Sequence, residues 1–324
     1  MDEEFLSDRR VLLTGATGFV GGALYPELRR HGYRVRCATR DPVAAAARLP
    51  GRDWVRMDAA APGSVRAALE GMNGAYYLVH GMAGGHGYPE RERGAAEVFR
   101  DAACAARVGR IVYLGGVLPP HAASRHLESR RETGAILRAG PVPVVELRCS
   151  MIVGEGSASW RICRDLAARV PLLLLPRWLQ SRTQPVAIVD VVRALRVALE
   201  IPLSRSFVAD LPGPETLTGE EILLRIAALR GTRPRVAHVP LLTPRLSGLW
   251  LRVVSGADYA VARELVTGLT QDLLSTESSF WRWMTDPPTP FDDAVRAALA
   301  AEHPTAPERL IEGLMRRLAR RTTS

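Results

Sequence analysis

The chain has 324 residues, of which 47% are hydrophobic and 24% charged, a composition typical of a folded globular protein. This length allows one large α/β unit or two lobes. The formal net charge is +9, and all 43 basic residues are arginine. Because the sequence contains no lysine, it offers none for a Schiff base, for general-base catalysis or for assisting a tyrosine.

The positive charge would suit nucleic acid or an anionic membrane, but its distribution argues against both. The arginines are scattered along the chain and interleaved with acids and alanines, with no combined aromatic and basic stripe. We therefore interpret them as solvated faces and expect no nucleic-acid partner. The cluster Arg316–Arg321 is the exception, and a frayed basic terminal helix accounts for it.

The cysteines and the apolar segments favour a cytoplasmic protein without a membrane span. The four cysteines show no close pair and no metal-ligand spacing, and no secretory leader is present, so we expect reduced thiols and no metal. The apolar run 171–176 is too short to cross a bilayer. The stretch 241–254 is interrupted by Arg245 and Arg252. A helix packed in the core is favoured there over an interfacial helix, so peripheral membrane contact is disfavoured.

The first predicted strand leads into the glycine-rich turn Thr14-Gly15-Ala16-Thr17-Gly18-Phe19-Val20-Gly21, and an amphipathic helix follows. In a dinucleotide site the first glycine makes the tight turn, the second lets backbone approach a pyrophosphate, and the third lets helix pack on strand. The helix N-terminus then presents N–H groups to the phosphates. A turn without a ligand is the alternative, and the strand–turn–helix context favours the ligand. Pro26 is expected to kink this helix or to shift its first turns.

Strand and helix patterns alternate through the first half of the chain. Strands are predicted at residues 10–14, 33–39, 54–58, 75–80, 110–114 and 142–147, with further helices at 63–70, 90–107 and 125–139. The segment 75–80 is almost continuously apolar, which is typical of a buried parallel strand. The pattern predicts an α/β fold of the Rossmann type, a doubly wound parallel sheet covered by helices on both faces.

Beyond residue 150 the pattern changes to a smaller, mostly helical C-terminal lobe. A helix with Trp160 on one side is followed by a short strand at 184–189 and by a helix that Asp190 is predicted to N-cap. A final strand is predicted at 207–209, and Thr218 with Glu221 forms a capping box. We expect a dinucleotide-binding domain at 8–156, continued by 184–212, and a substrate lobe made of 157–183 and 213–324.

These landmarks together resemble the extended and atypical short-chain dehydrogenase/reductase superfamily, from about residue 10 to about residue 300. Within it, Tyr76-Tyr77-Leu78-Val79-His80 and Leu114-Gly115-Gly116 are similar to segments of the NmrA-like NAD(P)H-binding members. The resemblance implies a bound nicotinamide dinucleotide, with Asp58 at the adenine and 79–82 along the ribose. The full set of implied cofactor-binding residues is Thr14, Gly15, Ala16, Thr17, Gly18, Phe19, Val20, Gly21, Arg40, Asp58, Val79, His80, Gly81, Met82, Gly115, Gly116, Arg130, Cys149 and Ser150.

The end of the second strand indicates which dinucleotide is bound. A ribose 2′-hydroxyl favours an acid at this position, whereas a 2′-phosphate favours an arginine. The strand ends at Thr39-Arg40, with Asp41 one residue later. NADP(H) is therefore favoured over NAD(H). In the alternative, Arg40 is a solvated loop residue and Asp41 serves NAD.

The catalytic pattern departs from the superfamily, which pairs a serine after strand five with Tyr-x-x-x-Lys on the next helix. Gly115-Gly116 stands where the serine would lie, and His126 and Arg130 stand where the tyrosine and lysine would lie. Arginine at 130 can hydrogen-bond the nicotinamide ribose, and His126 can act as general acid. A solvated or capping histidine is the alternative. Tyr88 is a further candidate proton donor, unless it only anchors its loop.

The remaining candidates concern the substrate pocket. Cys149 is interpreted as a packed small hydrophobe, because the sequence places no base beside it. Trp160, Trp178 and the segment 172–175 either shape an apolar substrate pocket or belong to the core of the lobe.

Three functions compete. The favoured one is an NADP(H)-dependent oxidoreductase acting on a small, mainly apolar carbonyl or enone compound. The second is a non-catalytic, NmrA-like regulator that senses the NADP(H) state, which the missing serine, tyrosine and lysine support. A sugar-nucleotide epimerase or dehydratase ranks last, because those enzymes depend on the tyrosine–lysine pair.

Overall fold

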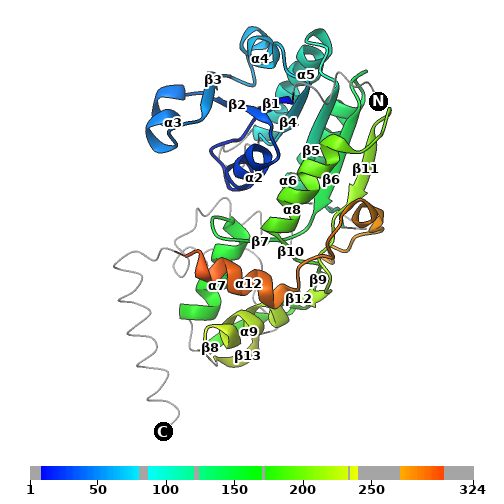
Figure 1. Cartoon of the computed structure of the whole chain (residues 1–324). Coiled ribbons are helices and arrows are strands. Elements are labelled where there is room, and N and C mark those ends of the chain that lie inside the picture. Colours follow the sequence, from blue (N-terminus) through cyan, green and yellow to red (C-terminus); the bar gives the residue numbers. More distant parts are fainter. Residues whose placement is uncertain are drawn as a thin grey trace.

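A seven-stranded parallel sheet forms the centre of the computed structural model, which describes residues 9–79, 87–119, 124–169, 172–232, 234–239 and 271–302 (Figure 1). The strand order is β11-β6-β5-β4-β1-β2-β3. The strands are β1 (Arg10–Leu13), β2 (Arg34–Thr39), β3 (Asp53–Arg56), β4 (Gly74–Tyr77), β5 (Arg110–Gly116), β6 (Val144–Cys149) and β11 (Phe207–Asp210). This is the expected Rossmann-type sheet, and its order reverses between β1 and β4, where such folds bind ligands.

Helices cover both faces of the sheet. On one face lie α2 (Phe19–Arg30) and α8 (Ile188–Glu200), which bury Leu24 and Leu195 against the strands. On the other lie α4 (Pro62–Leu69), α5 (Tyr88–Ala105) and α6 (Arg125–Arg138), which bury Phe99 and Leu137. At the β2–β3 edge lies α3 (Pro42–Arg48). The two apolar layers form because central parallel strands bury both faces.

Most of the remaining elements lie below the carboxyl edge of the sheet in Figure 1, whereas the 3₁₀ helix Ser279–Trp283 lies beside β11 and buries Phe280 in the main core. The helices are α7 (Ala158–Arg169), α9 (Gly219–Leu229) and α12 (Phe291–Ala300), with short 3₁₀ helices at Arg177–Gln180 and Ser279–Trp283. Three two-stranded sheets join β7 (Ile152–Val153) to β10 (Val186–Ala187), β9 (Arg182–Thr183) to β12 (Leu217–Thr218), and β8 (Leu172–Pro176) to β13 (Arg235–Val239). Trp160 is fully buried in the core of this region. It therefore belongs to the core, and the side chain of Trp178 lies outside the described residues.

Several local predictions can be compared with the observed helices. The capping box at Thr218 and Glu221 is present. The prediction that Asp190 N-caps a helix is wrong, because α8 begins two residues earlier, after Ala187. The buried Asp190 carboxylate instead accepts hydrogen bonds from the N–H (2.7 Å) and Oγ1 (3.0 Å) of Thr289. Helix α2 starts directly after Gly18 and continues through Pro26, so its first turn is not shifted.

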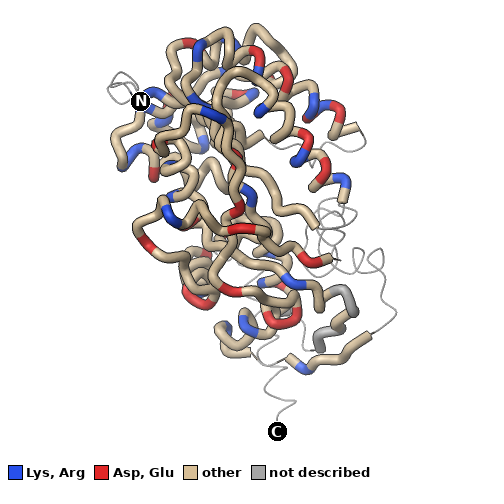
Figure 2. The backbone as a smooth tube through the Cα atoms, turned by 90° about the vertical axis from the view of Figure 1, so that its right-hand side faces the viewer, with Lys and Arg blue, Asp and Glu red and all other residues tan. Residues whose placement is uncertain are grey.

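Strand β11 pairs in parallel with β6 and so adds a chain segment after residue 184 to the main sheet. The predicted domain boundaries themselves stay a prediction. Arginine and acidic positions are interspersed over the face shown in Figure 2. Many of them pair locally, as Arg93 does with Glu132 and Arg131 with Glu128.

Candidate functional site

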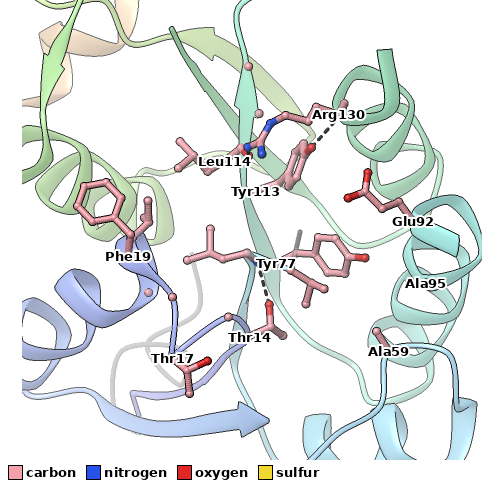
Figure 3. Close-up of a pocket in the computed structure, with 18 of the residues that line it drawn as sticks. Thr14, Thr17, Phe19, Ala59, Tyr77, Glu92, Ala95, Tyr113, Leu114 and Arg130 are labelled. Carbon is pink, nitrogen blue, oxygen red and sulfur yellow. Dashed lines mark hydrogen bonds between the residues drawn. The ribbon is translucent and has the colours of Figure 1, made fainter. Parts of the chain in front are cut away.

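A cavity of about 770 Å³ runs along the carboxyl ends of β1, β2, β4, β5 and β6 (Figure 3). It lies where the strand order reverses, which is the ligand-binding position of doubly wound folds. Its wall contains most of the described residues that the sequence predicted for cofactor and catalysis. These are Thr14, Gly15, Thr17, Gly18, Phe19, Val20, Gly21, Arg40, Asp58, Val79, Tyr88, Gly115, Gly116, His126, Arg130, Cys149 and Ser150.

Four predicted cofactor residues are placed differently or not described. Ala16 is fully buried and is absent from the cavity wall; its carbonyl oxygen accepts a hydrogen bond from Nη1 of Arg52 at 3.1 Å. His80, Gly81 and Met82 lie outside the described residues.

The geometry of the turn explains two of its three glycines. Gly15 has φ +64°, and a Cβ built there would lie 2.4 Å from the carbonyl oxygen of Leu78. A Cβ at Gly21 would lie 2.3 Å from the carbonyl oxygen of Gly15. Any side chain at these positions would push the turn away from β4 or α2 away from the turn. Gly18 is the N-cap of α2, so the positive end of the helix faces the cavity.

Thr14 fastens the turn to the neighbouring strand. Its Oγ1 donates to the carbonyl oxygen of Tyr76 at 2.8 Å and accepts from the N–H of Leu78, also at 2.8 Å (Figure 3). The threonine side chain thereby completes the pairing of β1 with β4 just where β1 ends. Because this buried hydroxyl both donates and accepts a hydrogen bond, it holds the turn in a single position.

At one end of the cavity, Arg40 and Asp58 lie in the wall and Asp41 does not. The Asp41 side chain is the N-cap of α3, where Oδ1 accepts from the N–H of Ala44 at 3.0 Å. Oδ1 of Asp58 accepts from the N–H of Ala60 at 3.0 Å. The exposed guanidinium of Arg40 is therefore the charged group that this edge of β2 presents to the cavity.

At the other end, α6 presents His126 and Arg130 beside the ends of β5 and β6. Nη2 of Arg130 donates to the carbonyl oxygen of Leu114, and the Arg130 carbonyl accepts from the hydroxyl of Tyr113 at 2.9 Å (Figure 3). His126 is half-buried in the first turn of α6, whose N-cap is Ser124. His126 and Arg130 thus both line the cavity.

Cys149 and Ser150 follow β6 at this end. Burial raises the pKa of the Cys149 thiol to about 12, and the opposing effect of Arg130 is smaller. The thiol therefore stays protonated and is not a nucleophile near neutral pH. Oγ of Ser150 donates to the carbonyl oxygen of Gln184 at 2.9 Å.

Tyr88 is the first residue of α5, with its ring in the cavity wall and the Arg125 guanidinium 6.0 Å from the ring centroid. The cavity wall also includes Glu92 and Ala95 of the same helix, which the sequence analysis missed. They follow Tyr88 at helical spacing of four and seven residues, so the face of α5 was readable once Tyr88 was a candidate. Oε2 of Glu92 accepts from Oγ of Ser129 on α6.

Gly115 and Gly134 both lie against a buried carboxylate. Glu146 on β6 is buried and forms an ion pair with Arg138. A Cβ at Gly115 would lie 2.9 Å from Oε1 of Glu146, and one at Gly134 would lie 2.3 Å from Oε2. A side chain at 115 would require the buried Glu146 carboxylate to shift.

The wall contains a second group that the sequence analysis missed, at the start of α7. Ser157, Ala158 and Ser159 line the cavity together with Ile152. The hydroxyl oxygens of Ser157 and Ser159 lie 3.0 Å apart, and Oγ of Ser157 accepts from the N–H of Trp160 at 3.4 Å. The loop follows β7, which pairs with β10 more than 30 residues later in the chain, and the local sequence does not indicate this pairing.

Two negative findings apply to the ranges that the structure describes. No helix there is long and apolar enough to cross a membrane. Histidine, cysteine and acidic side chains in those ranges form no group suited to holding a metal ion.

Comparison with known proteins identifies the cofactor class. Residues 15–139 match a family model described as NAD(P)H-binding. Dihydroflavonol 4-reductase of Zea mays is 33% identical over 119 residues, which are 32% of this chain and 33% of that protein. The match thus spans about a third of the length of that curated relative.

Solved structures match over most of the chain. Triphenylmethane reductase of Citrobacter sp. superposes with a TM-score of 0.73 at 17% identity, covering 90% of this chain and 99% of that one. The same reductase complexed with NADP(H) gives a TM-score of 0.71. A nucleoside-diphosphate-sugar epimerase of Staphylococcus aureus gives 0.68 at 16% identity, covering 89% and 99%. At these identities the likeness concerns the fold.

The geometry of the site and the family match both indicate that the glycine turn binds NAD(P)H. The matched range contains the turn, Arg40, Asp58 and Arg130, all at the cavity. Residues 15–139 therefore form an NAD(P)H-binding domain, and the chain as a whole shares its fold with the triphenylmethane reductase and the nucleoside-diphosphate-sugar epimerase.

Proposed function

We propose that the protein is an NADP(H)-dependent oxidoreductase that acts on a small, mainly apolar carbonyl or enone compound. The observation that carries the proposal is the extent of the cavity. It continues past the glycine turn and the ends of β5 and β6 to Ile152 and the 157–159 loop. A cofactor sensor needs no open space beyond the cofactor, whereas a reductase needs room for a second molecule there.

Each end of the cavity has a role in this proposal. The glycine turn and the N-terminus of α2 would hold the pyrophosphate, Arg40 the 2′-phosphate, and Arg130 the nicotinamide ribose. The bound cofactor supplies the hydride, and the chain supplies position and a proton. His126 is the residue proposed to deliver that proton to the substrate oxygen.

The names of the relatives guide the choice of substrates. Dihydroflavonol 4-reductase and triphenylmethane reductase are both named for aromatic compounds. The Phe19 and Ile152 side chains give this end of the cavity an apolar wall that suits such rings. The four free cysteines support a reducing, cytoplasmic location as part of the same proposal.

The second candidate, an NADP(H)-sensing regulator, is favoured by a different observation. Gly115 and Gly116 replace the usual serine, and the positions of the tyrosine and lysine hold His126 and Arg130. A regulator would bind NADPH without consuming it. A sugar-nucleotide epimerase has less support, since it would need the tyrosine–lysine pair for proton transfer.

The test measures NADPH oxidation against a panel of aromatic ketones, enones and a triphenylmethane dye. With an accepted substrate, His126→Ala should lower turnover by about 10²–10⁴-fold, because a positioned general acid contributes that much. NADPH affinity should change little. Glu128→Gln, an exposed change two residues along α6, serves as the matched control and should keep full turnover.

The native enzyme should also show a pH profile with one limb that His126→Ala abolishes. Full turnover in His126→Ala would remove histidine from the mechanism and leave the proton to Tyr88 or solvent. If the whole panel produces no NADPH oxidation while NADPH still binds, the regulator replaces the oxidoreductase.

A further inference from the structure

We propose that Arg52 is a positioning residue for the cofactor pyrophosphate, acting through the backbone of the glycine turn. Arg52 lies just before β3 and is absent from the cavity wall. Its Nη1 reaches the turn from behind and donates to the carbonyl oxygen of Ala16 at 3.1 Å. The glycine pattern itself does not include Arg52.

The Arg52 guanidinium is itself held firmly in place. It lies over the ring of Tyr25 on α2, 4.2 Å from the centroid, and 6.0 Å from the ring centroid of Trp54. The indole Nε1 of Trp54 donates to the carbonyl oxygen of Leu49 at 3.2 Å, which fixes that ring. Stacking against aromatic faces is a property of the planar guanidinium that an ammonium group does not share.

Fixing the Ala16 carbonyl also fixes the N–H of the next residue. The peptide group is planar and trans, so the carbonyl of Ala16 and the N–H of Thr17 point in opposite directions. The carbonyl accepts from Arg52, which does not line the cavity, whereas Thr17 lies in the cavity wall (Figure 3). The Thr17 N–H is thereby turned toward the ligand side of the turn.

Hydrogen bonding by a cation has a second effect on the same peptide. A carbonyl that accepts from a charged donor is polarised, and its N–H becomes a stronger donor. Arg52 would thus both aim and strengthen a backbone donor where the glycine turn meets the pyrophosphate. Its role is separate from that of Arg40, which is proposed to bind the 2′-phosphate.

Because Arg52 and Arg40 are proposed to act on different phosphates, two small ligands can distinguish their roles. ADP carries the pyrophosphate without the 2′-phosphate, and adenosine 2′-monophosphate carries the reverse. Arg52→Met keeps an apolar stem against Tyr25 and removes the donor. We expect it to weaken NADPH, NADH and ADP by the same factor, about tenfold or more, and to leave adenosine 2′-monophosphate unchanged. Arg40→Ala should weaken NADPH and adenosine 2′-monophosphate and leave NADH and ADP unchanged.

Calorimetric titration of purified protein measures all four ligands, and no turnover is required. Arg48→Met, an exposed change on neighbouring α3, controls for general loss of positive charge. Arg52→Lys keeps the charge without the planar group and should recover only part of the affinity. Tyr25→Leu, which removes the stacking partner, should weaken the same three ligands by a smaller factor. This variant replaces Arg52→Met in the test if Arg52→Met does not fold.

Three results would overturn the proposal. A lowered melting temperature with unchanged ligand affinities would make Arg52 purely structural. A loss confined to NADPH and adenosine 2′-monophosphate would mean direct contact with the 2′-phosphate. Full recovery of the ligand affinities in Arg52→Lys would mean that Arg52 contributes only its positive charge. Because these readouts are binding constants, they are independent of whether the protein proves to be a reductase.

Discussion

At the scale of single residues, two adjacent side chains at the end of β2 have opposite charges and different partners. Asp41 accepts the Ala44 N–H as the N-cap of α3, and it does not line the cavity. Arg40 does line it. An aspartate that caps a helix stabilises that helix by about 0.5–2 kcal/mol and would lose this contact on turning to a ribose. The geometry therefore supports NADP(H) over NAD(H).

Replacement of Arg40 tests this directly. Arg40→Ala should weaken NADPH binding by about 1.5–3 kcal/mol, the contribution of a hydrogen bond to a charged group. NADH affinity should stay nearly unchanged, because NADH lacks the 2′-phosphate. Fluorescence titration at fixed salt measures both, with Arg48→Ala as the control for net charge. Equal affinities for NADPH and NADH in the native protein would contradict the assignment.

At the scale of elements, a buried arginine at the first position of β5 binds the end of α8. Arg110 is 6% exposed, and burial lowers the pKa of its guanidinium. Its Nη1 donates to the carbonyl oxygens of Leu199 (2.9 Å) and Ile201 (2.6 Å), and its Nη2 to that of Leu203 (2.5 Å). The carbonyls left over at a helix C-terminus thus find a cationic partner.

This contact should be important for stability. Arg110→Met leaves several buried carbonyls without a donor, and each unsatisfied group costs about 1–3 kcal/mol, partly offset by the lost burial of a charge. We expect the free energy of unfolding to fall by about 2–3 kcal/mol in urea titrations. Arg131→Met, on an arginine that is 58% exposed, should change it by less than about 0.5 kcal/mol. A similar small effect of both variants would refute the capping role.

At the scale of the whole molecule, the first half was predictable because its local signals agree. Apolar strands, a glycine turn and amphipathic helices follow one another, and each strand predicted in this half pairs into the seven-stranded sheet. Helix α3 was missed because its alanines at 44–47 carry no apolar periodicity. Glu92 follows Tyr88 at helical spacing, whereas the 157–159 loop reaches the cavity wall with the long-range pairing of β7 and β10. Such long-range packing leaves no local trace in a sequence.

Long-range packing also explains the misread role of Asp190. As an N-cap it would have been a local, solvated acid. It is instead buried and holds Thr289, so it links α8 to the segment before α12. Burial raises the pKa of the Asp190 carboxyl, and the hydrogen bonds from Thr289 and the charge of Arg193 only partly oppose this.

This raised pKa predicts how stability depends on pH. Below the ordinary aspartate pKa of about 3.9 the group is protonated in both states. As the pH rises through the folded-state pKa, the unfolded chain binds fewer protons than the folded one, so the contribution to stability is lost. Each unit by which the folded-state pKa exceeds the unfolded-state pKa corresponds to a loss of about 1.4 kcal/mol in the free energy of unfolding.

Asp190→Asn removes this titration and keeps an oxygen that can accept from the Thr289 N–H. We expect the free energy of unfolding of the variant, relative to the native protein, to increase between about pH 4 and pH 7. Urea unfolding at several pH values measures that difference, so the titrations of other groups cancel. Asp293→Asn, on an acid that is 59% exposed, should show no such trend. A difference that stays constant, or that falls with rising pH, would mean that Thr289 and Arg193 outweigh the burial of the carboxylate.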